Sequence, residues 1–587
     1  MTPAAVLPQV IAAVEAEGRR LRAEFYAPQG PRGRRGSCPA DTEIEERLQV
    51  ALQALIPAQF CGEECAVKPG TRAGWVWLVD PHDGTFEFTA GRRGSAVSVA
   101  LVRDGVPVLG VVHAPDAPDR GPDTIAWAEG AGPILRNGRA IRPDLSQEQL
   151  GPGKFVWATA SSAWRPEIWS RAALPSRYVA MPSIAYRLAR VAAGDGVATV
   201  SIHGVNEYDI AAGMALISAA GGVALDREGA EIRLQGNSDH RVTGCFAGAP
   251  RAAAQLARFD WSLLDTEPRR EPRVTLGFPR KEDPARLARA QGVLLGQVIG
   301  DSLGSRVELK PAVEIAAHFP HGVRDLGDGG VYHTMAGQPT DDSEMALSLA
   351  RAIVREGRYE SEKVLDAYRA WLTSRPVDVG ETTERGLLGM NTTESESNGS
   401  LMRVSPIGVW AAGDPALAAR TARDDSMLTH TSATCIEACA AYCAAIAAGV
   451  AGASREEMIE VAAAHAKGPA HEAVKRASKG VAPSDFFTHP GWVLVALQNA
   501  FWCLHHLEFE EALVQTVGHG GDTDTNAAIA GALLGALHGR DAIPPRWILP
   551  LLACRPLAEA GALRPRPIEY WPDDVLDVAE ALLLIRG

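Results

Sequence analysis

A proline-rich, charged segment between Asp265 and Asp283 divides this chain of 587 residues. The segment contains the runs EPRREPR and PRKEDP and little apolar sequence, a composition typical of a linker. A chain of this length is also too long to fold around one hydrophobic core. The sequence therefore predicts two domains, at residues 1–262 and 284–587, joined by a linker over residues 263–283.

The hydrophobic pattern differs on the two sides of this segment. Before it, residues 97–112 alternate around an Asp-Gly turn, which predicts a β-hairpin, and a strand at 221–225 and a helix at 184–193 are also expected. This mixture predicts a layered α/β domain. After the segment, apolar residues recur with helical spacing and no alternating strand is evident, so we expect an all-α domain. Helices are expected at 285–300, 343–356, 361–374, 435–451, 456–466 and 525–538.

The N-terminal half carries acidic residues around a tight turn. Asp80 and Asp83 stand at i and i+3 of the sequence DPHDGT, in which proline and glycine favour a turn after an apolar strand. Glu63 lies upstream, and Asp209 begins an alanine-rich predicted helix downstream. A turn with an aspartate at each corner is the alternative for the first pair alone. The two further carboxylates favour a metal site.

The C-terminal half carries two acidic signatures, TDDS at residues 340–343 and GGDTDT at residues 520–525. Carboxylates this close together repel one another unless a divalent cation lies between them. Hard oxygen donors suit Mg²⁺ or Mn²⁺ better than Zn²⁺, and four carboxylates suggest two ions. The alternative for either signature alone is capping of the helix that follows it.

The N-terminal segments together resemble the inositol monophosphatase superfamily of Mg²⁺-dependent, Li⁺-sensitive phosphatases, over about residues 10–250. The stretches 84–88 and 95–101 look closest to the bisphosphate nucleotidase branch, which acts on 3′-phosphoadenosine 5′-phosphate. The resemblance implies that Thr85, oriented by Asp41, positions the attacking water, and that the side chain of His82 only fills a variable position. The implied metal ligands are Glu63, Asp80, the backbone carbonyl of His82, Asp83 and Asp209.

Four C-terminal motifs occur in the order found in the ADP-ribosylglycohydrolases, over roughly residues 290–547: GQVIGDSLG at 296–304, TDDS, NGSLMR at 398–403 and GGDTDTN. The resemblance implies an all-α fold and a dimetal centre that binds ribose hydroxyls and presents a water to the glycosidic carbon. Glu308 and Asp342 are expected to assist catalysis, although an exposed helix-end position is the alternative for Glu308. The implied metal ligands are Thr340, Asp341, Asp342, Asp522, Asp524 and Thr525.

The same resemblance implies where the substrate is held. Asn398, Gly399 and Ser400 would supply amide donors to the phosphates of ADP-ribose. His430 matches a position that contacts ribose or phosphate in relatives, and a buried core histidine is the alternative.

Composition limits the remaining possibilities. The net charge of −13 argues against nonspecific nucleic-acid binding, and nine cysteines without paired short spacings favour a reducing cytoplasm. Residues 7–26 predict an amphipathic helix rather than a secretory signal. The alanine-rich stretch 435–453 predicts a buried helix rather than a membrane span, with its three cysteines packed in the core rather than around a soft metal.

These observations lead to the hypothesis of a bifunctional cytoplasmic hydrolase with two or more Mg²⁺ (or Mn²⁺) ions in each domain. One domain would remove ADP-ribose from a protein, nucleic acid or small molecule, and the other would remove phosphate from a nucleotide or sugar. In one alternative, only one half is catalytic and the other is a binding or scaffold module. In another, the metals are purely structural. The oligomeric state stays open.

Overall fold

The computed structural model describes residues 1–586 except 35, 66, 237–239 and 281. The chain forms two compact units, which are described separately. The N-terminal unit comprises residues 1–272 and 276–282, and the C-terminal unit comprises residues 273–275 and 283–587. The N-terminal unit combines sheets with helices and the C-terminal unit is helical, as the hydrophobic patterns predict.

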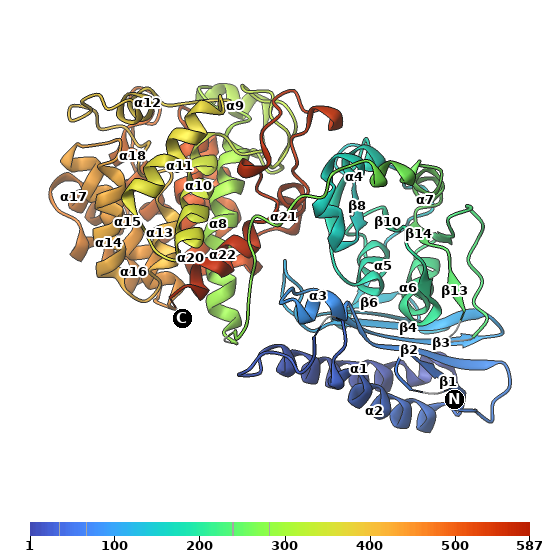
Figure 1. The fold of residues 1–587 in the computed structure, drawn as a ribbon. Helices are drawn as coiled ribbons and strands as arrows, with labels where there is room; N and C mark the ends of the chain where they lie inside the picture. The colour runs from blue at the N-terminus through green and yellow to red at the C-terminus, as the bar shows by residue number, and fades with distance from the viewer. Residues whose placement is uncertain (35, 66, 237–239, 281, 587) are drawn as a thin grey trace. The chain divides into compact units, whose positions relative to one another are not determined.

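A seven-stranded sheet forms the centre of the N-terminal unit (Figure 1). β1 runs parallel to β2, and every later neighbouring pair is antiparallel. The predicted hairpin is confirmed, with Asp104 (φ 50°) and Gly105 (φ 80°) in the left-handed conformation that a two-residue turn requires. The strands are β1 (Gln59–Gly62), β2 (Trp75–Asp83), β3 (Ala96–Arg103), β4 (Val106–Ala114), β5 (Asp123–Ala128), β6 (Ile134–Arg136) and β7 (Arg139–Ile141), in that order.

Helices cover both faces of this sheet. The alternation of β2 points Trp77 and Val79 into a core shared with α1 (Pro3–Phe25) and α2 (Pro39–Leu55). On the other face lie α5 (Ile184–Ala192) and α6 (Glu207–Ala219), which contact β3 and β4 (Figure 1).

A second, five-stranded sheet lies beyond α5 and α6, which contact it on one side, while α4 (Pro166–Ala173) and α7 (Pro250–Ala257) contact it as well (Figure 1). Its strands are, in spatial order, β12 (Val223–Leu225), β14 (Cys245–Gly248), β10 (Ala198–Ser201), β8 (Phe155–Ala158) and β9 (Arg177–Ala180). A short pair, β11 (Val205–Asn206) and β13 (Arg241–Val242), and the one-turn α3 (Thr85–Thr89) complete the unit.

Within its described residues, the C-terminal unit has helices and no assigned strand. All six predicted helices are confirmed to within a few residues. The helices are α8 (Pro284–Gly304), α9 (Ala312–His318), α10 (Asp341–Glu356), α11 (Ser361–Thr373), α12 (Glu381–Leu387), α13 (Ser405–Trp410), α14 (Pro415–Ser426), α15 (Ala433–Val450), α16 (Arg455–His465), α17 (Gly468–Ser478), α18 (Val493–His506), α19 (Phe509–Gly518), α20 (Thr523–His538), α21 (Pro545–Leu552) and α22 (Val575–Leu584).

α8 and α20 pack with their backbones in contact, because α8 carries glycine at every fourth position from residue 292 to residue 304. A Cβ atom on Gly300 would lie 2.1 Å from the carbonyl oxygen of Ala527, and one on Gly304 would lie 2.4 Å from the Cα atom of Asp524. Any larger side chain would force the helices apart. The stripe therefore brings the C-terminal end of α8 against the N-terminal end of α20.

α15 is the helix, among those described, that is long and apolar enough to cross a membrane, yet 83% of it is buried inside the protein. The prediction of a buried helix is confirmed. Each of its three thiols donates a hydrogen bond to a different oxygen. Cys435 donates to the backbone carbonyl of Ser397, Cys439 to the Ser400 hydroxyl and Cys443 to the backbone carbonyl of Val404. This arrangement supports packing rather than a soft-metal site.

The segment predicted as a linker makes side-chain contacts at several of its residues. Arg273 forms ion pairs with Asp573 and Asp574 within the C-terminal unit. Phe278 and the buried Arg280 pack against Phe25 of the N-terminal core. Whether each unit folds on its own stays a prediction.

Candidate metal centres

The N-terminal carboxylates meet at one edge of the seven-stranded sheet. Gly62 pairs with Val79 in the parallel ladder of β1 and β2, so Glu63 follows its strand beside Asp80. Asp83 ends β2, and Asp209 lies in the first turn of α6, which packs on β2. The predicted gathering of these four residues is therefore a consequence of strand register and helix packing.

These carboxylates repel one another strongly. Burial and the charges of Glu63, Asp83 and Asp209 raise the pKa of Asp80 well above its usual value. Burial and the charge of Asp83 do the same to the pKa of Asp209. Glu63 is exposed when the whole residue is considered, whereas its carboxyl group is largely desolvated. This desolvation and the neighbouring negative charges raise the pKa of Glu63 to about 7. A divalent cation would relieve this repulsion, and the donor set of oxygens fits Mg²⁺ or Mn²⁺.

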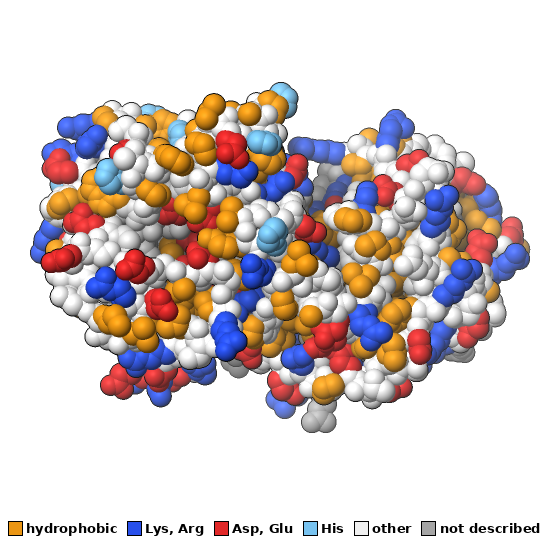
Figure 2. Space-filling view, turned by 90° about the horizontal axis from the view of Figure 1, so that it is seen from above, with side chains coloured by type: hydrophobic (Ala, Val, Ile, Leu, Met, Phe, Trp, Pro, Cys, Tyr) orange, Lys and Arg blue, Asp and Glu red, His pale blue; other side chains and the backbone are white. Residues whose placement is uncertain are grey.

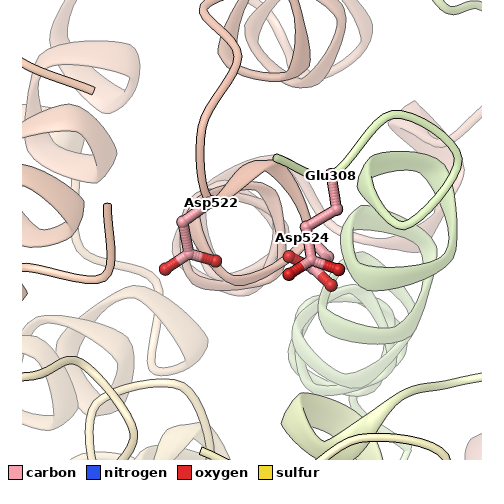
Figure 3. A group of neighbouring side chains, drawn as sticks. All are labelled: Glu308, Asp522 and Asp524. Carbon is pink, nitrogen blue, oxygen red and sulfur yellow. The ribbon is translucent and has the colours of Figure 1, made fainter. Parts of the chain in front are cut away.

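The C-terminal acidic residues cluster where helices begin and end. Thr340 and Asp522 are the N-cap residues of α10 and α20, yet neither side chain makes a capping hydrogen bond. Carboxylate oxygens of Glu308, Asp522 and Asp524 lie within 4.8 Å of one another, the tightest group of potential ligands among the described residues (Figure 3). Glu308 comes from the loop after α8, and the two aspartates come from the start of α20 (Figure 3).

Backbone pairing holds these segments together. The N–H of Leu309 donates to the carbonyl of Gly521 at 2.8 Å, and the N–H of Gly521 donates to that of Lys310 at 3.1 Å. Asp301 on α8 accepts hydrogen bonds from the backbone N–H groups of Thr340 and Ser343 and from the Thr340 hydroxyl. The two acidic signatures are thus both anchored to the C-terminal end of α8.

The electrostatics of this group favour a cation. Burial, followed by neighbouring carboxylates, raises the pKa of Asp341, Asp342 and Asp524 well above the usual range. Burial raises the pKa of Glu308 to about 7. The Oδ1 atom of Asp342 and the Oε2 atom of Glu308 are buried without a hydrogen-bond partner, and buried oxygens without partners are costly unless a ligand satisfies them. The residues present therefore fit a metal centre.

Comparison with known proteins agrees with this division into two centres. Residues 282–580 match the family model "ADP-ribosylglycohydrolase", and residues 38–262 match the model "Inositol monophosphatase family". The chain is a fusion of these two families. We refer to its halves below as the phosphatase-family domain and the glycohydrolase-family domain.

This chain covers most of the length of relatives of each domain. The ADP-ribosyl-[dinitrogen reductase] glycohydrolase of Rhodospirillum rubrum is 32% identical over 284 residues, which is 44% of this chain and 89% of that protein. The probable inositol 1-monophosphatase ImpA of Mycobacterium tuberculosis is 30% identical over 243 residues, 39% of this chain and 82% of that protein. A solved "ADP-ribosylglycohydrolase-related protein complex" matches 52% of this chain and 99% of that chain at 27% identity, with a TM-score of 0.43.

One predicted contact in the phosphatase-family domain is wrong. Asp41 does not orient Thr85, because its Oδ1 atom lies 2.7 Å from Nδ1 of the buried His82. The hydroxyl of Thr85 instead donates to the backbone carbonyl of His82 at 2.7 Å. The His82 side chain also packs edge-on against Phe88, so it is a structural partner of Asp41 and does more than fill a variable position.

Another difference concerns Asp83, whose Oδ2 atom accepts hydrogen bonds from the Ser183 hydroxyl (2.5 Å) and the backbone N–H of Ala185 (2.6 Å). These donors stand at the beginning of α5. One oxygen of Asp83 is therefore engaged by the protein, and its Oδ1 atom is the better candidate ligand.

The predicted substrate residues of the glycohydrolase-family domain are largely occupied by internal partners. The Asn398 side chain donates to Asp522 at 2.7 Å, and its backbone N–H donates to the carbonyl of Gly491. The buried Ser400 hydroxyl oxygen accepts hydrogen bonds from the Ser426 hydroxyl and the Cys439 thiol, and Gly399 is buried as well. These groups shape the loop, so the expectation that Asn398 and Ser400 donate directly to phosphate is not supported by their contacts.

His430 is a core residue. It is fully buried, its Nδ1 atom lies 2.8 Å from the Thr429 hydroxyl, and its Nε2 atom lies 2.9 Å from the Ser397 hydroxyl. Burial, with the charge of Arg403, lowers its pKa to about 3. These contacts favour the alternative of a buried core histidine, because one ring nitrogen is engaged by Thr429 and the other by Ser397 of the loop at residues 397–400. Glu308, in contrast, is buried, which excludes its exposed alternative.

Sequence reasoning missed three residues at the glycohydrolase centre. The Asp378 carboxylate, from the connection between α11 and α12, raises the pKa of Asp341 and Glu308 through its charge. The Tyr332 phenol lies beside Glu308, and Asp301 anchors the TDDS turn. Asp301 stands in a quoted motif and could have been found. Asp378 stands alone in its segment, without the clustered acidic residues that mark the two signatures.

Proposed function

We propose that the chain is a bifunctional metal-dependent hydrolase. The glycohydrolase-family domain would cleave an N- or O-glycosidic bond of ADP-ribose, and the phosphatase-family domain would hydrolyse a phosphomonoester. The observation that carries the proposal is the pair of separate carboxylate groups, one in each unit, each built from segments that its family motif contains. Mg²⁺ or Mn²⁺, two or more ions in each domain, would neutralise charge and activate water when bound.

In the glycohydrolase-family domain, Thr340, Asp341, Asp342, Asp522, Asp524 and Thr525 would hold the ions. Positive charge develops on the ribose as the glycosidic bond breaks, and the surrounding carboxylates would stabilise it electrostatically. Glu308, with a pKa raised to about 7, is suited to exchange a proton near neutral pH.

The surface near Asp522 suits a nucleotide-bearing substrate. Figure 2 shows Asp and Glu side chains gathered in a hollow on one face of the C-terminal unit, with hydrophobic side chains beside them. Trp492 is 39% exposed and follows Gly491, where an added Cβ atom would lie 3.5 Å from Asp522. A partly exposed indole in this position offers a surface on which a nucleobase can stack.

In the phosphatase-family domain, Glu63, Asp80, the carbonyl of His82, Asp83 and Asp209 would hold the ions. Thr85 would contact the attacking water through the lone pairs of its hydroxyl oxygen, because its proton is donated to the carbonyl of His82. We propose that the helix and sheet layers of this unit are those of the inositol monophosphatase fold.

The substrates are proposed by class. Relatives include an ADP-ribosylarginine hydrolase Tri1 of Pseudomonas putida, 26% identical over 51% of this chain and 85% of that protein. An ADP-ribosylated arginine is therefore the first acceptor to test. For the phosphatase we propose a nucleotide or sugar phosphate, with 3′-phosphoadenosine 5′-phosphate as the first candidate. We also propose a cytoplasmic location, which is supported by the absence of paired short spacings among the nine cysteines of the sequence.

A direct assay tests this proposal. The intact protein with Mg²⁺ or Mn²⁺ should release ADP-ribose from an ADP-ribosylated arginine peptide and phosphate from a panel of phosphorylated adenosines and inositols. EDTA should abolish both activities. If only one product forms with every substrate, the other domain is a binding module, and the bifunctional proposal fails.

A further inference from the structure

The buried guanidinium of Arg566, from the segment between α21 and α22, joins three parts of the glycohydrolase-family domain. Two of its nitrogens donate to Glu344 on α10, each at 2.7 Å. The third nitrogen, Nη1, donates to the backbone carbonyls of Ser374 (3.0 Å) and Arg375 (3.1 Å), and Nη2 donates to the Ser374 hydroxyl (2.8 Å) as well as to Glu344. Glu344 is fully buried and also accepts a hydrogen bond from the indole of Trp371 at 2.8 Å.

These contacts define a clamp, which we call the Arg566 clamp: Arg566, Glu344 and the backbone of residues 374–375. Arg375 has a φ of 57°, a left-handed conformation that is unfavourable for an arginine, and the clamp bonds its carbonyl. The chain then leaves this turn and reaches Asp378 three residues later. Glu344 stands two residues after Asp342 on the same helix.

The clamp therefore fixes the connection that carries Asp378 to the helix that carries Asp341 and Asp342. Asp378 follows the clamped turn by three residues, and the charge of its carboxylate acts on Asp341, Glu308 and the Tyr332 phenol, whose pKa values it raises. We propose that Arg566 and Glu344 are positioning residues for ADP-ribosyl hydrolysis: they hold the Asp378 carboxylate at the acidic centre without touching the substrate. The catalytic part of this inference rests on the proposed function, whereas the placement of the loop does not.

A buried ion pair of this kind also contributes to stability, so the test needs a matched control. Arg351 supplies it, because this residue on the same helix donates to the carbonyls of Glu569 and Trp571 and to Asp574, and so ties α10 to the same C-terminal segment. Its hydrogen bonds among the described residues go to this C-terminal segment and not to residues 374–378. Arg566→Lys and Arg351→Lys each replace a forked guanidinium by an ammonium that makes fewer hydrogen bonds.

Three measurements on the full-length variants separate positioning from stability: the melting temperature, kcat and KM for ADP-ribose release, and hydrogen exchange of residues 374–380. Both lysine variants should melt at a lower temperature. Only Arg566→Lys should lose kcat, by about 10–100-fold with little change in KM, because a misplaced catalytic geometry costs that much. Of the two lysine variants, only Arg566→Lys should show faster exchange at residues 374–380. Glu344→Gln should show the same loss of kcat and the same faster exchange, both more weakly.

Equal kcat values in Arg566→Lys and Arg351→Lys would overturn the inference, as would unchanged exchange at residues 374–380. If the wild-type protein releases no ADP-ribose, the proposed function fails, and the exchange experiment still decides whether the clamp places the loop. Phosphatase activity should be the same in all variants.

Discussion

The backbone N–H of Leu309 donates to the carbonyl of Gly521 at 2.8 Å, although 212 residues separate them in the chain. This bond pins the residue before Leu309, the buried Glu308, beside the residue after Gly521, Asp522. Main-chain pairing between two loops thus assembles the metal centre of the glycohydrolase-family domain. Because these bonds do not involve side chains, substitution of an acidic side chain should reduce activity more than it disturbs the path of the two loops.

Asp522→Ala should reduce ADP-ribosyl hydrolysis by at least about 100-fold and leave phosphatase activity intact, because it removes a proposed ligand from one centre only. Asp80→Ala should do the reverse. Both activities are measured on each purified variant. Asp366→Ala, an exposed substitution on α11, serves as the neutral control. Loss of both activities in either variant would indicate one composite site or a folding defect.

The metal-free protein should become less stable as the pH rises towards and through about 7. Burial raises the pKa of Glu308 and of Glu63 to about 7 from the ordinary value of 4.5 for a glutamate, so the folded state holds protons that the unfolded state has released. Thermal unfolding in EDTA should give a higher melting temperature at about pH 5.5 than at about pH 8, and added Mg²⁺ should stabilise most at the higher pH. Glu308→Gln should flatten the dependence in EDTA. A melting temperature that rises with pH would contradict this account.

Ca²⁺ should inhibit the phosphatase in the presence of Mg²⁺. Ca²⁺ accepts ~6–8 oxygens in loose geometry, so it would occupy the carboxylate site without the octahedral alignment that Mg²⁺ imposes. Li⁺ is expected to inhibit as well, on the basis of the family resemblance. Phosphate release is measured while each ion is titrated, with Na⁺ as the control. Activation by Ca²⁺ would rule out an octahedral Mg²⁺ requirement.

The phosphatase is expected to prefer a nucleotide to an inositol phosphate. This preference rests on the resemblance of residues 84–88 and 95–101 to the bisphosphate nucleotidases. The values of kcat/KM for 3′-phosphoadenosine 5′-phosphate and inositol 1-phosphate are compared at the same Mg²⁺ concentration. A ratio of about one, which means equal transition-state stabilisation, or a ratio below one, which means a preference for the inositol phosphate, would discard the nucleotide assignment.

His82→Leu should destabilise the phosphatase-family domain by about 1–3 kcal/mol, because it leaves the buried Asp41 carboxylate without its imidazole partner. The double variant Asp41→Asn, His82→Leu should be more stable than the sum of the single effects predicts, which a double-mutant cycle in urea would measure. Strict additivity would show that the two residues do not interact.

Gly300→Ala should destabilise the glycohydrolase-family domain by about 1–3 kcal/mol and weaken ADP-ribosyl hydrolysis, because the added methyl group would overlap the carbonyl of Ala527 on α20. Gly518→Ala is the matched control, since a Cβ atom there meets nothing within 4 Å. Chemical unfolding and activity are compared for the two variants. A Gly300→Ala protein as stable and active as the control would mean that the helices can separate without cost.

Local sequence was sufficient for much of the architecture. The hairpin around Asp104-Gly105 and the helices beginning near the TDDS and GGDTDT signatures were predicted, because turn residues and hydrophobic periods act over a few neighbouring positions. The family resemblance likewise identified the two domains. It also pointed to Glu308, but the structure was needed to show that this residue is buried rather than exposed.

Only the tertiary structure decided what each polar group contacts. The sequence could not show that Asp41 bonds His82 rather than Thr85, that Asn398 donates to Asp522, or that both nitrogens of His430 are engaged. It gave no signal for Asp378, whose place beside Asp341 depends on the Arg566 clamp. The physical reason is that hydrogen-bond partners and burial depend on packing between elements that are distant along the chain, such as the glycine face of α8 against α20. The local sequence pattern specifies only which elements form.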